Sequence, residues 1–85
     1  MQTSKKRKQL QPKTDATIDL HGYTIEVAYG QCQSYLNRYN SMGKNTVQVI
    51  TGKSGRIRYE APFWFSNWGY KATLSKDGGS FIVRL

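Results

Sequence analysis

The stretch Thr46-Val47-Gln48-Val49-Ile50-Thr51 is the clearest strand in this chain of 85 residues. Most of its residues are β-branched, and the alternation places Val47 and Val49 together on one face of a sheet. A glycine loop, Gly52-Lys53-Ser54-Gly55, follows directly. The apolar residues beyond it recur at helical spacing, which predicts a helix over residues 56–68. A strand that leads through a short loop into a helix is the basic unit of an α/β sheet.

The segments on either side extend this pattern. Residues 17–21 have the pattern of a short strand, and a helix is expected after it, from the N-cap Thr24 to Gly43, which ends it. Two further strands are predicted over residues 70–74 and 81–85, joined by an Asp-Gly turn. The order β-α-β-α-β-β predicts a two-layer α/β sandwich, in which two helices pack on a mixed four-stranded sheet with right-handed connections between its earlier strands.

Composition narrows the class of protein. Lys and Arg total 13 against 5 Asp and Glu, a net charge of +8, which favours a polyanionic partner and places DNA or RNA ahead of acidic protein. Cys32 is the only cysteine, so an internal disulfide and a cysteine-based zinc site are excluded, and we expect its side chain in the core. No apolar run is long enough for a membrane span or a signal peptide, so we expect a cytoplasmic protein with no membrane partner.

Residues 1–14 differ in character from residues 15–85. The first segment is basic, contains no acid and has almost no apolar residues, so it cannot bury enough surface to offset the entropy lost on ordering. We expect a disordered basic arm that attracts phosphates, followed by one folded domain. A solubility tail and a nuclear localisation signal are the alternatives for the arm. Its basic cluster consists of Lys5, Lys6, Arg7 and Lys8.

Asp19 and His21 form the candidate chemical pair. They lie two residues apart in a predicted strand, so both side chains leave the same face, and Gly22 follows directly. A carboxylate beside an imidazole orients the ring and selects its tautomer, as proton-transfer chemistry requires. The alternative is an Asp-x-His arrangement that only caps a loop.

The two glycine loops are expected to meet at one edge of the sheet. Ligands of α/β sheets bind where loops leave the carboxyl ends of parallel strands, so Asp19 and His21 should lie near Lys53. Arg56 and Arg58 would add positive charge there, and the whole forms a candidate phosphodiester site. A solvated basic face that binds without chemistry is the alternative. A Walker A loop is excluded, since Val47 stands where that motif needs its first glycine.

Four short motifs resemble those of the Smr (small MutS-related) domain family. They are Asp19-Leu20-His21-Gly22, Val47 to Lys53, Gly55-Arg56-Ile57-Arg58 and Gly78-Gly79. The resemblance spans residues 17–85 and implies an α/β sandwich that binds nucleic acid and, in several members, cleaves it. It assigns Asp19 and His21 to cleavage, and Gly52, Lys53 and Gly55 to nucleic-acid contact.

Two positions depart from the family's pattern. The second motif has Ser54 directly before Gly55 and is one residue short, and Phe81 stands where a glycine is common. Thr51 occupies a position that is histidine in some members. Proton transfer would therefore depend on His21 alone or be shared with a metal-bound water.

The leading hypothesis is an Smr-type endonuclease that cleaves or nicks RNA or DNA. His21 would transfer protons, and Asp19 would orient it or hold a divalent metal such as magnesium. A non-catalytic DNA/RNA-binding module of the same fold is the alternative, and a protein-interaction adaptor is a third reading; the oligomeric state is not predicted. Tyr23 could stack on a base or have a structural role. The residues expected to contact nucleic acid are Gly22, Gly52, Lys53, Ser54, Gly55, Arg56 and Arg58, with Lys5, Lys6, Arg7 and Lys8 of the arm.

Overall fold

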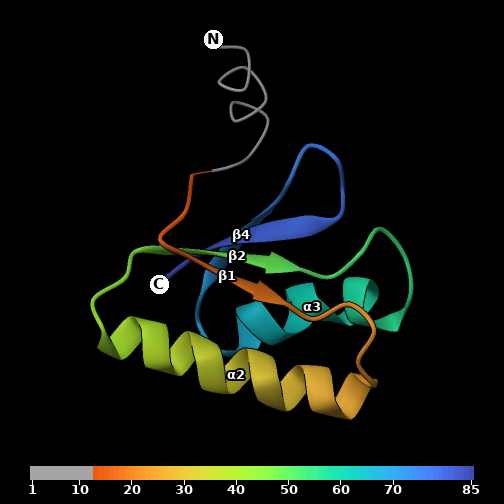
Figure 1. Cartoon of the computed structure of the whole chain (residues 1–85), viewed down its shortest axis with the longest axis horizontal. Helices are drawn as coiled ribbons and strands as arrows, with labels where there is room; N and C mark the ends of the chain where they lie inside the picture. Colours follow the sequence, from red (N-terminus) through yellow and green to blue (C-terminus); the bar gives the residue numbers. More distant parts are fainter. Residues whose placement is uncertain (1–12) are drawn as a thin grey trace, which may run out of the picture.

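The structure of the protein is a computed structural model, and it is described here for residues 13–85 (Figure 1). The basic cluster predicted at Lys5 to Lys8 lies outside the described residues. The elements in chain order are β1 (Ala16–Asp19), α2 (Ile25–Ser41), β2 (Thr46–Ile50), α3 (Arg56–Asn67), β3 (Lys71–Leu74) and β4 (Ser80–Arg84). Their order confirms the predicted β-α-β-α-β-β arrangement, with ends that differ by one residue from most predicted bounds.

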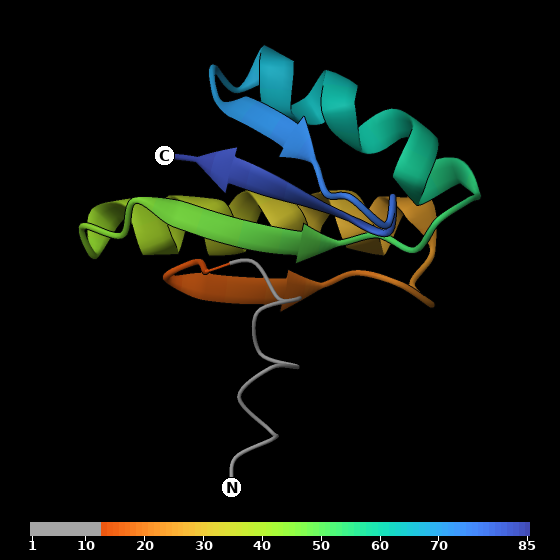
Figure 2. The same cartoon turned by 90° about the horizontal axis from the view of Figure 1, so that it is seen from above.

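The four strands form one mixed sheet in the order β1-β2-β4-β3. Strands β1 and β2 are parallel, whereas β4 is antiparallel to both β2 and β3. Both helices lie against the same face of this sheet (Figures 1 and 2). The predicted two-layer sandwich is therefore confirmed.

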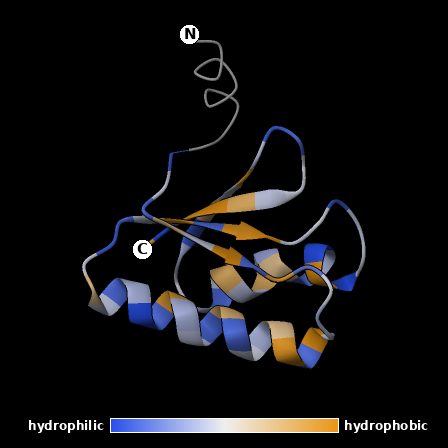
Figure 3. Ribbon diagram, in the orientation of Figure 1, coloured by the Kyte–Doolittle hydropathy of each residue, from blue (hydrophilic) through white to orange (hydrophobic). Residues whose placement is uncertain are grey.

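The core lies between the sheet and the two helices. Val49 of β2 pairs with Ile18 of β1 on one side and with Phe81 of β4 on the other, and all three side chains are buried. The Phe81 ring contacts Phe65 of α3 with centroids 5.5 Å apart. Figure 3 shows the apolar residues along the strands that the helices cover. The alternation seen in the sequence of β2 therefore does select the buried face.

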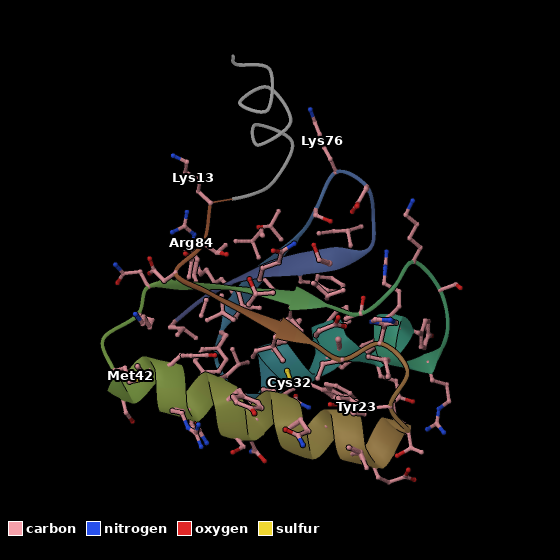
Figure 4. The ribbon with its side chains drawn as sticks, viewed as in Figure 1. Lys13, Tyr23, Cys32, Met42, Lys76 and Arg84 are labelled. Carbon is pink, nitrogen blue, oxygen red and sulfur yellow. The ribbon has the colours of Figure 1, made fainter. Side chains whose placement is uncertain are left out.

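Helix α2 presents a narrow apolar stripe to the sheet. Its fully buried members, Ala28, Cys32 and Leu36, recur every four residues, which places them on one side of the helix. Cys32 points from α2 toward the sheet (Figure 4). Burial raises the pKa of this thiol to about 12, so the side chain stays a neutral thiol and serves packing. Its predicted place in the core is confirmed.

The start of β1 is fastened to the start of β2 by one carboxylate. Asp15 Oδ2 accepts hydrogen bonds from the backbone N–H groups of Asn45, at 2.7 Å, and Thr46, at 3.2 Å. These two bonds lower the pKa of Asp15 below its ordinary value, because they favour the ionised form. Charge-assisted hydrogen bonds from Asp15 thus hold the starts of the parallel strands β1 and β2 together.

Replacing Asp15 should make stability less sensitive to acid. Because the folded-state pKa is lowered, ionised Asp15 stabilises the protein above its unfolded pKa of about 3.9, and this contribution disappears as the pH falls through the folded value. Asp15→Asn should therefore lower the free energy of unfolding at pH 7, and by less at pH 3. Urea denaturation of both proteins at the two pH values measures this, and an equal difference at both would contradict the assignment.

Candidate functional site

The loops that follow β1 and β2 meet at one edge of the sheet. Both strands end there because they are parallel, and both helices begin there (Figure 2). Between the loops lies a hollow of about 560 Å³, which we call the loop-edge hollow. It is lined by residues 21–26 after β1 and by residues 51–57 after β2. The predicted meeting of the two glycine loops is the arrangement that the structure has.

Asp19 and His21 are in direct contact at this edge. Asp19 Oδ1 lies 2.5 Å from His21 Nδ1 and also accepts a hydrogen bond of 3.1 Å from the His21 backbone N–H. The bond to the imidazole is the main reason why the pKa of Asp19 is lowered. An ionised carboxylate can only accept, so Nδ1 carries the proton and Nε2 is left free. The imidazole is therefore oriented, and its side chain is 67% exposed on the wall of the loop-edge hollow.

The glycine loop after β2 is held in place by the β3–β4 hairpin. The backbone N–H groups of Thr51 and Gly52 both donate to the Gly79 carbonyl at 3.0 Å. The buried Thr51 hydroxyl donates to the Gly52 carbonyl at 2.8 Å. The Gly78-Gly79 motif thus supports the second loop rather than lining the hollow.

The two helix starts at the hollow differ in charge and capping. Helix α2 has Thr24 as its cap, whose hydroxyl accepts from Val27 N at 3.3 Å, and Glu26 in its first turn. Helix α3 begins after Gly55 with no side-chain cap and no acid in its first turn. Its first backbone N–H groups and the positive end of its dipole are therefore free for an anion. Lys53, an exposed residue of the same loop, adds a cation beside them.

The two predicted arginines lie in different places. Arg56 lines the loop-edge hollow and pairs with Glu60, at 3.0 Å, on the exposed face of α3. An exposed pair of this kind is weak, so the guanidinium can exchange its partner for a phosphate. Arg58 is not among the residues that line the hollow. It donates to the Gly78 carbonyl at 3.1 Å and lies over the Phe81 ring, so it fastens α3 to the hairpin.

Few side chains near Asp19 and His21 could bind a metal ion. Residues 13–85 contain no group of three or more His, Cys, Asp or Glu side chains that could hold an ion together. A magnesium ion here would take Asp19 as its carboxylate, with substrate phosphate and water as the other ligands. It would supply positive charge to the phosphate. Within the same residues, neither helix is long and apolar enough to cross a membrane.

The structure has a second hollow that the sequence did not predict. It measures about 290 Å³ and lies between β1 and α2; we call it the tyrosine hollow. Its lining consists of residues 17–20 with Tyr23, Gln31, Tyr35 and Tyr39. The apolar residues of the α2 sequence, which recur every three or four positions, include Tyr35 and Tyr39. In the structure Tyr35 is 36% exposed and lies at the margin of the buried stripe. The two tyrosines at four-residue spacing, with Arg38 between them, were the available signal.

Two glycine-to-alanine changes should have opposite effects on stability. Gly55 has φ of 98° and ψ of 177°, a region that is essentially restricted to glycine, so Gly55→Ala should cost about 1–3 kcal/mol. Gly30 lies inside α2, where alanine is favoured by roughly 0.5–1 kcal/mol. Both new methyl groups would meet open space. Thermal unfolding should therefore give a lower Tm for Gly55→Ala and a higher one for Gly30→Ala; changes of the same sign would contradict the backbone argument.

The family assignment agrees with this geometry. The family model of the Smr domain matches residues 18–79, which include both loops, both helices and the Gly78-Gly79 motif. No curated protein and no solved structure matches the chain. The chain belongs to the Smr domain family, a family of nucleic-acid-binding and nuclease-type modules.

Proposed function

We propose that this protein is an Smr-type endonuclease that cleaves the phosphodiester backbone of RNA or DNA. The observation that carries the proposal is the shared hollow: oriented His21 forms one wall, and Lys53 with the uncapped start of α3 forms the other. A phosphate between these walls would meet a proton acceptor on one side and positive charge on the other. That combination is what phosphodiester cleavage needs.

The proposed step uses the nitrogen that Asp19 leaves free. Nε2 of His21 removes a proton from the attacking hydroxyl, which is a water molecule or, in RNA, the ribose 2′-hydroxyl. The oxygen forms a new bond to phosphorus, and the bond to the leaving oxygen breaks with its electron pair, after which that oxygen takes up a proton. Ionised Asp19 stabilises the imidazolium that forms. Lys53 and the first N–H groups of α3 neutralise the charge on the phosphate oxygens.

A non-catalytic DNA/RNA-binding module is the second candidate, and one observation favours it. Asp19 Oδ1 accepts from the His21 backbone as well as from the ring. A carboxylate that bonds a backbone N–H two residues later is a common loop-capping arrangement. In this reading the pair shapes the loop, while Lys53 and the start of α3 bind phosphate without chemistry.

Turnover separates the two candidates. We would incubate the protein with end-labelled single-stranded RNA, hairpin RNA, single-stranded DNA and supercoiled plasmid, each with and without a chelator. His21→Ala should reduce cleavage by about 10²–10⁴-fold, the usual contribution of a general base, while binding is retained. Gln33→Ala, an exposed change on α2 that touches neither hollow, should cleave at the parent rate.

Each outcome assigns the site. Equal cleavage by the parent and His21→Ala would remove His21 from the reaction, whereas binding of every substrate without any product would favour the binding module. Loss of cleavage in the chelator lanes alone would show that a metal shares the reaction with His21.

A further inference from the structure

The tyrosine hollow continues the loop-edge hollow. Tyr23, at the start of α2 (Figure 4), lines both. His21 lines the first hollow and Asp19 the second, so their pair lies at the boundary. A polymer whose phosphate sits in the loop-edge hollow could therefore extend past Asp19 into the tyrosine hollow without leaving the surface.

The tyrosine hollow is lined by aromatic rings and, at the end next to His21, by the Asp19 carboxylate; a cation, Arg38, lies beside it over the Tyr35 ring. The rings of Tyr35 and Tyr39 are stacked, with centroids 6.2 Å apart and an interplanar angle of 25°. The guanidinium of Arg38 lies 5.4 Å from the centre of the Tyr35 ring. In residues 13–85 the ion pairs are His21–Asp19 and Arg56–Glu60, so Arg38 is not paired with a described carboxylate. Thr17 and Gln31 add polar groups to the lining.

These groups match an unpaired nucleobase better than other ligands. A base has a flat π-face that stacks on tyrosine and a polar edge that hydrogen-bonds to amides and hydroxyls. Bases inside a duplex already stack on one another and cannot offer that face. An acidic peptide would pair with Arg38 but would add no stacking contact to the tyrosines, so it would use only part of this surface.

We propose that the tyrosine hollow binds unpaired bases next to the cleaved phosphate, so that the substrate is single-stranded RNA or DNA, or a single-stranded segment of a larger molecule. The inference rests on the proposed function for the position of the phosphate. Stacking on Tyr35 and charge from Arg38 would hold the strand on one side of the Asp19–His21 pair. Lys53 and the start of α3 would hold it on the other side.

The test compares base-bearing and base-free strands with the full 85-residue chain. Fluorescence anisotropy would measure binding of uridine and thymidine homopolymers of about 12 nucleotides, the same lengths built from abasic nucleotides, and a duplex. Tyr35→Ala should weaken binding of the base-bearing strands about tenfold and leave abasic binding unchanged, while Tyr35→Phe should keep the parent affinity. Tyr59→Ala is the matched control, because Tyr59 is 72% exposed on α3 and lines neither hollow.

Several results would overturn the proposal. The first is that Tyr35→Ala weakens binding of abasic strands as much as binding of base-bearing strands. The second is that Tyr59→Ala weakens binding as much as Tyr35→Ala does. The third is that the duplex binds as tightly as the single strands. Competition by polyglutamate that Tyr35→Ala removes would assign the hollow to an acidic protein partner instead. The uridine and thymidine arms distinguish RNA from DNA.

A lysine pair separates this inference from the proposed function. Lys53→Ala should weaken binding of all strands, abasic ones included, whereas Lys71→Ala on the exposed face of β3 should not. If Lys53→Ala weakens binding and Tyr35→Ala does not, the inference alone is overturned. If Tyr35→Ala weakens binding and Lys53→Ala does not, the phosphate site of the proposed function is overturned instead.

Discussion

The parallel pairing of β1 with β2 is the constraint on which the rest of the structure depends. Its register places Asp19 opposite Ile50, so the two strands end side by side. The loop after each strand then leaves at the same edge, and each helix begins there because it must return across the same face of the sheet. A shift of one residue would turn Asp19 toward the core and move His21 away from the glycine loop.

The two helices that begin at this edge differ in how their first turns are capped. Thr24 and Glu26 satisfy and neutralise the start of α2, a cap that typically contributes about 1 kcal/mol to stability. The start of α3 forgoes that contribution, since Gly55 offers no side chain. The loop that precedes it is instead held through its backbone by the Gly79 carbonyl. Stability is thus supplied by the hairpin, and the free N–H groups and Lys53 remain available for a phosphate.

Local signals in the sequence were sufficient for the elements, and topology was sufficient for the meeting of the loops. The β-branched alternation in residues 46–50 and the Thr24 cap act within a few residues, so they can be read without tertiary structure. Such local signals could not show that Arg56 and Arg58 have different positions. They carry the same charge two residues apart, but the helix turns by about 200° between them, and packing decides that one reaches the hollow and the other the hairpin. The tyrosine hollow also depends on packing, since periodicity does not distinguish the centre of an apolar stripe from its margin.

The central claim is that nucleic acid binds at the sheet edge where the two glycine loops meet. The most direct measurement is a titration of ¹⁵N-labelled protein with a short single-stranded oligonucleotide, followed by the amide shifts of each residue. The account predicts the largest shifts at Gly22, Tyr23 and residues 52–55, with saturation at one common affinity. Shifts confined to the face of the sheet that the helices do not cover, at Gln48, Thr73 and Ile82, would contradict it.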